Sequence, residues 1–229
     1  MTHIRLYFVC VAACLAAWPS AQASLINDLT RDQRQELEDG TLVVREQDIP
    51  GKPWPRVRIY KRISAAPEEV AAVFFDYDQA KTYIPDVLES KVSEKISPSV
   101  MEVDYAIDVP ILADEAYTAR NEIVRIGCGY RVSWTLLRAL QTKAAEGNLL
   151  IEPFENGTSV IRYTNLVTPS SGMAKILGQL AMSRMQKTVL AIGEKVEQQK
   201  SSHAAELTAQ VARLREALES PADPDTKNP

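Results

Sequence analysis

The segment from Ser171 to Lys200 is the longest continuous helical pattern in the chain, and it follows every strand-like segment. Its apolar residues recur at steps of three and four positions, which places them on one broad stripe of a long helix. The stripe comprises Met173, Ile176, Leu177, Leu180, Ala181, Met185, Val189, Ile192 and Val196. A stripe of this length needs a large apolar surface, which one curved sheet formed by the preceding strands would provide.

The composition indicates one globular domain with extensions. The chain has 229 residues, of which 45% are hydrophobic, and it is long enough to bury a substantial core. Its net charge is −4. A nucleic-acid surface needs clustered Lys and Arg to replace phosphate counterions, so we expect no nucleic-acid partner.

The first 23 residues have the features of a secretory signal peptide. Arg5 precedes an apolar run over residues 6–17 that is too short to span a bilayer, and an Ala-Gln-Ala motif predicts cleavage after Ala23. We therefore expect a periplasmic or secreted protein. The alternative is a lipoprotein with its lipid on Cys14, but the apolar run continues past Cys14 and favours the later site.

The mature chain has few residues suited to metal binding or nucleophilic catalysis. Cys128 is its only cysteine, so we expect neither an intramolecular disulfide nor a cysteine metal cluster. Cys128 lies between two glycines at a predicted turn, which favours a structural thiol. The histidines are His3 in the signal peptide and His203 in the tail, so we expect no metal and no cofactor.

The mature chain is predicted to open with a helical lead-in over residues 24–40. Thr30 is suited to cap the helix and Gly40 to end it. Strands are predicted over residues 41–48 and 56–63, separated by a proline-rich loop around Trp54. The second strand alternates between apolar and polar residues, and its face with Tyr60 is predicted to be solvated.

The middle of the chain changes from helix to strand. A helix is predicted over residues 67–77, with Pro67 at its first position, and a shorter one over residues 78–83. Asn156-Gly157 predicts a hairpin, because both residues tolerate positive φ. Strands are predicted over residues 87–96, 100–109, 115–126, 130–140, 142–154 and 159–167.

Three segments resemble START-like domains, also called Bet v 1-like or SRPBCC domains, the polyketide cyclase and lipid-transport superfamily. Residues 63–87, ISAAPEEVAAVFFDYDQAKTYIPDV, resemble the opening strand and helix of these domains. Residues 108–122, DVPILADEAYTARNE, are similar to their Pro, Asp and aromatic strand, with Glu115 where an Arg is common. The opening LTRDQRQELEDGTLVV is similar to the lead-in of exported bacterial members. The resemblance covers about residues 29–199.

The resemblance implies an α+β helix-grip fold. In this fold a curved antiparallel sheet wraps around a long C-terminal helix, two short helices lie near the start, and an apolar cavity lies between sheet and helix. Members bind lipids, sterols, polyketides, quinones or hormones, and some are cyclases or dehydratases. The domain itself would span residues 41–200. Because one fold hosts many functions, the function has to be argued from the site.

Candidate catalytic groups are limited to carboxylates and tyrosines. Most of them alternate onto the outer face of the sheet or lie in turns, which indicates ordinary surface charge, and no pair has a spacing that points to a reaction. We predict no catalytic residue. The groups are Asp76, Asp78, Asp104, Tyr105, Asp108, Asp114, Glu115, Tyr117 and Tyr163.

The candidate ligand-binding residues are aromatic and flexible apolar side chains on the central strands and the long helix. Methionine suits irregular ligands, although the same pattern is also typical of a plain core. The predicted set is Met101, Tyr105, Tyr117, Trp134, Tyr163, Leu177, Met182 and Met185. Arg120 and Arg162 would contact a ligand head group only if they pointed inward, and a solvated strand face is the favoured interpretation for both.

Beyond the long helix, Leu207, Val211, Leu214 and Leu218 repeat at four-three-four spacing. They predict an amphipathic helical extension over residues 201–220. This helix either extends the long helix or contacts a protein partner through residues 203–219. Residues 221–229 are rich in proline and charge and are predicted to be disordered.

The sequence therefore predicts an exported binding protein or carrier for a hydrophobic small molecule such as a lipid or isoprenoid, with transient membrane contact. Two alternatives stay open. One is a cyclase or dehydratase acting on a polyketide-like or aromatic substrate, and the other is an envelope protein-interaction module with a filled core.

Overall fold

The computed structural model describes residues 24–109, 114–170 and 174–220. The predicted signal peptide and C-terminal tail lie outside these residues. The strands are β1 (Val43–Gln47), β2 (Arg56–Ile63), β3 (Val87–Ser97), β4 (Val100–Ile107), β5 (Glu115–Ile126), β6 (Gly129–Ala139), β7 (Thr142–Pro153) and β8 (Ser159–Pro169). The helices are η1 (Leu25–Asp28), α1 (Arg31–Glu38), α2 (Pro67–Phe75), η2 (Tyr77–Thr82), η3 (Glu155–Gly157), α3 (Ala174–Ser202) and α4 (Ala204–Glu219).

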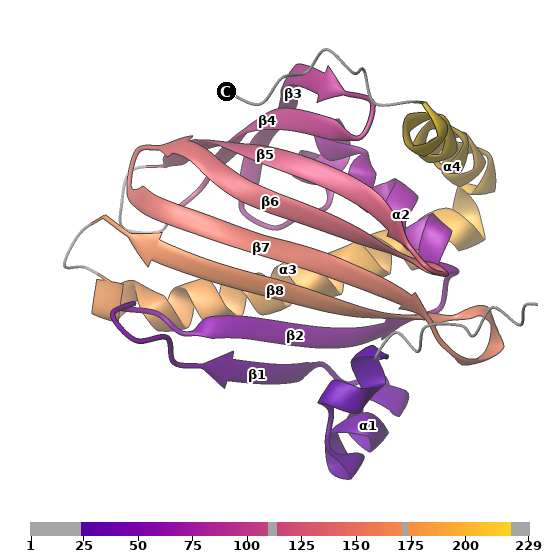
Figure 1. Ribbon diagram of the computed structural model, residues 1–229, viewed down its shortest axis with the longest axis horizontal. Helices are drawn as coiled ribbons and strands as arrows, with labels where there is room; N and C mark the ends of the chain where they lie inside the picture. The colour runs from indigo at the N-terminus through magenta and orange to yellow at the C-terminus, as the bar shows by residue number, and fades with distance from the viewer. Residues whose placement is uncertain (1–23, 110–113, 171–173, 221–229) are drawn as a thin grey trace, which may run out of the picture.

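The strands form one antiparallel sheet in the order β1-β2-β8-β7-β6-β5-β4-β3. The sheet curves around the long helix α3, which crosses behind it in Figure 1, with α2 and α4 near one end. The predicted helix-grip fold is therefore confirmed. The six strands predicted between residues 87 and 167 agree with β3 to β8 to within two residues at each end.

Two local predictions rest on backbone chemistry and are confirmed. The Thr30 hydroxyl accepts a hydrogen bond from the Gln33 N–H (3.3 Å), and the Gln33 side-chain oxygen accepts one from the Thr30 N–H (3.1 Å), so the pair caps α1. Asn156 and Gly157 have φ of 56° and 74°, and they turn the chain between β7 and β8.

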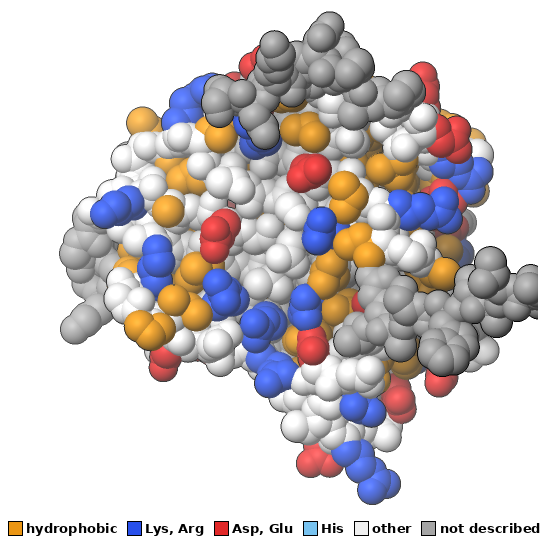
Figure 2. Space-filling view, in the orientation of Figure 1, with side chains coloured by type: hydrophobic (Ala, Val, Ile, Leu, Met, Phe, Trp, Pro, Cys, Tyr) orange, Lys and Arg blue, Asp and Glu red, His pale blue; other side chains and the backbone are white. Residues whose placement is uncertain are grey.

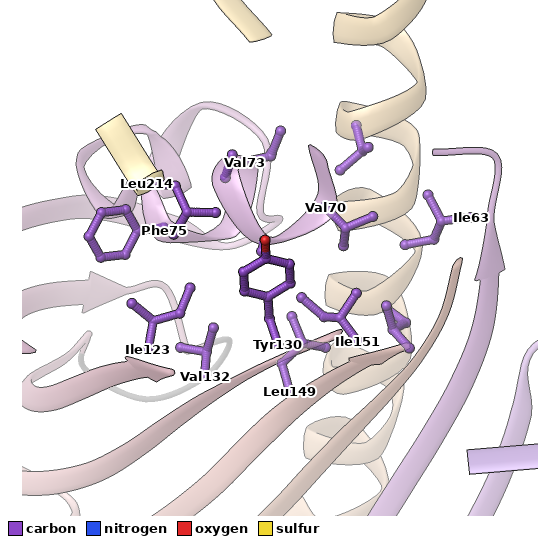
Figure 3. Close-up of a cluster of buried hydrophobic side chains, with 14 of the residues drawn as sticks. Ile63, Val70, Val73, Phe75, Ile123, Tyr130, Val132, Leu149, Ile151 and Leu214 are labelled. Carbon is purple, nitrogen blue, oxygen red and sulfur yellow. The ribbon is translucent and has the colours of Figure 1, made fainter. Parts of the chain in front are cut away.

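The solid core lies at one end of the sheet, beneath α2. Helix α2 begins at Pro67, and the Glu69 carboxylate accepts a hydrogen bond from the Ala66 N–H (2.7 Å). Val70 and Val73 of α2 are buried. Figure 3 shows them facing side chains of the central strands, among them Ile123, Tyr130, Val132, Leu149 and Ile151.

Helix α3 is divided along its length. Val189, Ile192 and Val196 in its C-terminal half have no exposed surface and belong to the core. Leu177 and Met185, in the N-terminal half, are only partly buried. The C-terminal half of α3 therefore packs as core, while the N-terminal half leaves space between itself and the sheet.

The outer face of the sheet carries scattered charged side chains, as Figure 2 shows. Arg120 pairs there with Glu102 (2.8 Å), in agreement with the predicted solvated face. Arg162 also lies on the outer face, where it pairs with Asp28. Neither guanidinium group therefore points toward the concave side of the sheet.

The prediction that the Tyr60 face of β2 is solvated is wrong. Tyr60 is fully buried, and its hydroxyl donates a hydrogen bond to the Asp28 carboxylate (3.1 Å). The N-terminal segment covers this face, with Leu25 and Leu37 packed against the Tyr60 side chain and its neighbours. An alternating pattern shows which side chains share a face, but it cannot show that a distant segment covers that face.

Helix α4 packs on α2 of the same chain, an arrangement that the sequence analysis did not consider. The chain turns at His203, which has φ −136° and ψ 43°. Leu207 and Leu214 are then buried in the core. The contact also includes ion pairs from α2 to the C-terminal helices, namely Glu68 with Arg215, Glu69 with Lys200 and Asp76 with Arg213.

Two further features concern the surface. Cys128 is an exposed free thiol in the turn between β5 and β6. Among the described residues, no helix is both long enough and apolar enough to cross a membrane.

Candidate functional site

A pocket of about 290 Å³ lies between the central strands and the N-terminal half of α3. This volume is at the small end of the range typical of small-molecule sites. Most of its wall is aromatic or aliphatic. Its lining residues are Trp54, Ile107, Val109, Glu115, Tyr117, Ala119, Trp134, Leu136, Gln141, Thr142, Ala145, Tyr163, Asn165, Val167, Pro169, Leu177, Leu180, Ala181, Arg184, Met185 and Thr188.

A second pocket of about 190 Å³ adjoins the first and shares part of its wall. Tyr117, Trp134, Tyr163 and Arg184 line both pockets. The second pocket extends toward Phe74, Tyr105 and residues 84–87, which lead into β3. We refer to the two together as the grip pocket.

Paired aromatic rings form the sheet side of the grip pocket. Tyr105 and Tyr117 face each other across β4 and β5, and their rings are stacked with centroids 5.0 Å apart. Trp134 and Tyr163 have centroids 5.0 Å apart. Successive side chains alternate between the faces of a strand, so these residues share the concave face. The sheet side of the pocket is therefore an aromatic wall whose rings lie at favourable distances for ring–ring contact.

The tyrosines of the grip pocket are neutral at ordinary pH. Burial raises the pKa of Tyr105, Tyr117 and Tyr163 well above the usual phenol value. A phenolate base is therefore absent from this wall under physiological conditions. The phenols can act as neutral hydrogen-bond donors.

Arg184 is a functional candidate that the sequence analysis missed. It lies on α3 and lines both parts of the grip pocket, with its Nε 3.4 Å from an Asp86 carboxylate oxygen. Residues 177, 181, 184 and 188 follow helical spacing and share the pocket-facing side of α3. This spacing could have identified Arg184, which stands next to the predicted apolar stripe.

Glu115 is the second missed residue, and its interpretation as surface charge is wrong. Its side chain is 5% exposed and lines the pocket. One carboxylate oxygen accepts hydrogen bonds from the backbone N–H groups of Leu140 and Gln141, and the other accepts from Gln141, all at 3.0 Å. Glu115 lies two residues before the inward-facing Tyr117 on β5, so the two share a face of the strand. This alternation could have indicated that Glu115 points inward.

The remaining candidate carboxylates lie away from the grip pocket. Asp104 accepts from the Thr118 hydroxyl and pairs with Arg138 on the outer face. Asp76 is bound to the C-terminal helix α4 through Gln210 and Arg213. The Asp78 carboxylate caps the Val92 N–H (2.7 Å), while Asp108 and Asp114 are exposed.

The structure brings together most of the ligand-binding residues predicted from the sequence. Six of them line the grip pocket, namely Tyr105, Tyr117, Trp134, Tyr163, Leu177 and Met185. Met182 instead packs against the core. Met101 lines a separate groove of about 390 Å³ between α2, α4 and the β3–β4 hairpin. Met173 lies outside the described residues.

The site offers no evident metal centre. Among the described residues, no three His, Cys, Asp or Glu side chains come close enough together to hold a metal ion. The charged groups of the grip pocket are Arg184, Asp86 and Glu115, and each of them has a partner within the chain. The arrangement is suited to enclosing a small apolar molecule.

Comparison with known proteins supports the fold through structure alone. No family model matches the sequence, and no curated protein matches it. A STAR-related lipid transfer protein from Xanthomonas axonopodis is 17% identical with a TM-score of 0.62, and the match covers 69% of this chain and 94% of that one. Human STARD10 is 16% identical with a TM-score of 0.59, over 80% of this chain and 78% of that one.

A third similar structure is the Zhui aromatase/cyclase from Streptomyces sp. R1128. It is 12% identical with a TM-score of 0.59, over 70% of this chain and 98% of that one. Matches at these identities show the fold, and this chain therefore has the START-like helix-grip fold. Because the neighbours include both lipid-transfer proteins and a cyclase, the fold does not choose between binding and catalysis.

Proposed function

We propose that this protein is an exported binding protein or carrier for a hydrophobic small molecule held in the grip pocket. One observation carries the proposal: the N-terminal half of α3 faces an aromatic pocket, whereas its C-terminal half packs as solid core. If the apolar stripe of α3 served stability alone, the helix would pack against the sheet along its whole length. The lipid-transfer proteins among the structural neighbours add support.

Capture would rest on burial of apolar ligand surface. Such burial is worth about 25 cal/mol per Å², reduced by the entropy lost on binding. Release needs part of the wall to move. The loop of Trp54 is a candidate for this movement, because it closes the pocket against α3: a Cβ at Gly178 would lie 3.4 Å from the Trp54 indole. The loop of Trp54 thus contacts the first turns of α3 at the pocket wall.

Transient membrane contact belongs to the same proposal. Leu140 is 71% exposed and directly precedes Gln141, which lines the pocket. Leu88 is 49% exposed and directly follows the pocket residue Val87. Exposed leucines beside a pocket are suited to dip into a lipid surface while a ligand transfers. Binding to vesicles should weaken in Leu140→Ser and stay unchanged in Leu190→Ser, a leucine 37% exposed on α3.

The two tryptophans of the mature chain provide the test. Trp54 and Trp134 are the only tryptophans in residues 24–229, and both line the pocket. Brominated fatty acids quench indoles on contact, so titration of the mature protein should quench tryptophan emission saturably. Unbrominated palmitate should compete for the site. Quenching that rises linearly without saturation, and that palmitate does not reduce, would refute the proposal.

A second candidate function is a cyclase or dehydratase, and the observation favouring it is the pair of carboxylates on the pocket wall. Asp86 and Glu115 could exchange protons with a substrate. Asp86 is paired with Arg184, however, and Glu115 holds backbone N–H groups. Enzymatic loss of water from an aromatic polyketide that Asp86→Asn abolishes, with binding retained, would favour the enzyme.

A further inference from the structure

Three tyrosines that line the grip pocket have hydroxyls without a hydrogen-bond partner among the described residues. Tyr105, Tyr117 and Tyr163 line the pocket, and none of their hydroxyls bonds to a described residue. The Tyr77 hydroxyl, on a side chain 3% exposed, is fully enclosed and also lacks a partner within the described chain. The Tyr105, Tyr117 and Tyr163 hydroxyls, unlike that of Tyr77, are open to the space of the pocket, so they are available as donors to a molecule that fills it.

Tyr105 and Tyr117 are close neighbours in the pocket wall, with ring centroids 5.0 Å apart. Ionisation of Tyr105 is opposed first by burial and then by Tyr117, Tyr77, Tyr83 and Tyr163, which raise its pKa further. The interior side of the pocket therefore presents several protonated phenols within a small region.

The other polar groups of the pocket complete a donor-rich wall. Arg184 contributes a guanidinium, whose charge Asp86 balances at 3.4 Å. Glu115 directs its oxygens to backbone N–H groups, and the Asn165 side-chain oxygen accepts from the Trp134 indole N–H (3.4 Å). The side-chain oxygens of Asp86, Glu115 and Asn165 thus have partners, whereas the phenol hydroxyls have none among the described residues.

A ligand that enters this wall should supply oxygen acceptors. A plain hydrocarbon chain would displace water from the phenols without accepting a hydrogen bond from them. A buried polar group left without a hydrogen bond is costly. A ring with carbonyl oxygens would accept from the phenols and stack on the two aromatic pairs. The small volume of each part of the pocket also fits a ring better than an extended chain.

We propose that the grip pocket prefers a flat, uncharged ring compound bearing carbonyl oxygens over a plain acyl chain. This inference rests on the proposed binding function and specifies its ligand class. The donors that select the oxygens are the hydroxyls of Tyr105, Tyr117 and Tyr163.

The test compares two probes of nearly equal shape on the mature protein, residues 24–229. Isothermal titration calorimetry measures the affinity of 2-methyl-1,4-naphthoquinone and of 2-methylnaphthalene, which lacks the oxygens. The quinone should bind at least tenfold more tightly. Each of Tyr105→Phe, Tyr117→Phe and Tyr163→Phe keeps the ring and removes one donor, and those whose hydroxyl reaches an oxygen should lose roughly fivefold in quinone affinity.

The matched control is Tyr60→Phe, because Tyr60 is a buried tyrosine of the same sheet whose hydroxyl hydrogen-bonds to Asp28 on the outer side. Its quinone affinity should stay unchanged. Naphthalene affinity should stay unchanged in all four variants, and thermal melting checks that each one folds.

Two results would separate this inference from the binding function on which it rests. If a dansyl-labelled undecanoic acid binds while the quinone binds no better than the hydrocarbon, the ring inference is wrong and the binding function stands. The same holds if no pocket Tyr→Phe variant loses quinone affinity. If none of the three probes binds, both are wrong.

Discussion

The indole of Trp134 lies against the backbone of Gly147 on the neighbouring strand. The two residues are partners across β6 and β7, and a Cβ atom at Gly147 would lie 2.4 Å from the indole ring. This is closer than any real Cβ contact. The missing side chain on β7 therefore creates the space that the aromatic wall of the grip pocket occupies.

We predict that Gly147→Val displaces Trp134 and damages the pocket. Overpacking of this kind typically costs roughly 1–3 kcal/mol in the free energy of unfolding. In a Trp54→Phe background the emission of Trp134 should shift to the red, which fluorescence spectroscopy measures directly. The control is Ala144→Val, an exposed position on the same strand. Unchanged emission in the Gly147 variant would show that the indole does not depend on this contact.

We predict that Ala181→Phe fills the pocket from the helix side. Ala181 lines the pocket on α3, so an added ring occupies ligand volume and should weaken binding of hydrophobic probes by roughly tenfold or more, since each buried methylene is worth about 0.8 kcal/mol. Ala209→Phe, on the exposed face of α4, should bind as the unmodified protein does. Equal affinities for the two variants would place the ligand elsewhere.

Glu115→Gln should destabilise the protein. The carboxylate accepts hydrogen bonds from the backbone N–H groups of Leu140 and Gln141, and charged acceptors make the stronger bonds. The amide keeps the size and removes the charge, so we expect a loss of roughly 1–3 kcal/mol, measured by urea unfolding. Glu122→Gln, exposed on the same strand, is the control and should unfold as the parent does.

The contact between α4 and α2 should depend on pH through Glu68. Its hydrogen bond from Arg215 lowers the Glu68 pKa below the usual Glu value. Because the Glu68 pKa is lower in the folded state, the Glu68–Arg215 pair contributes fully to the free energy of unfolding above the ordinary Glu pKa. It is lost as the pH falls through the lower, folded-state pKa.

Urea unfolding of the parent and of Arg215→Met at several pH values tests this dependence. The stability difference between the two proteins should be present at pH 7 and shrink as the pH falls below the usual Glu pKa. Arg131→Met, exposed on β6, should show no such change. A difference that persists undiminished at pH 3 would exclude Glu68 as the titrating group.

The elements of this fold were predictable because their patterns are local. The alternation of Met101, Val103 and Tyr105 with polar residues depends on the strand period alone, and β4 shows it. The positive φ that Asn156 and Gly157 tolerate is likewise a property of the residues themselves. The inward phase of Tyr117 and Trp134 follows from the same alternation.

The parts that were missed depend on contacts between distant segments. Nothing local marks the covering of Tyr60 by the N-terminal segment or the packing of Leu214 against α2. Glu115 and Arg184 were missed for another reason. A charged side chain is usually exposed, because burying a charge without a partner is costly. In the fold, backbone N–H groups offset this cost for Glu115, and an aspartate offsets it for Arg184.

The central claim is that the mature protein holds a hydrophobic small molecule, and native mass spectrometry tests it most directly. Residues 24–229, purified from bacteria without detergent, should show a species heavier than the bare chain by one small molecule. Organic extraction should release that molecule, and Ala181→Phe should reduce its amount. A spectrum of the bare chain alone, together with no saturable binding of any hydrophobic probe, would contradict the account.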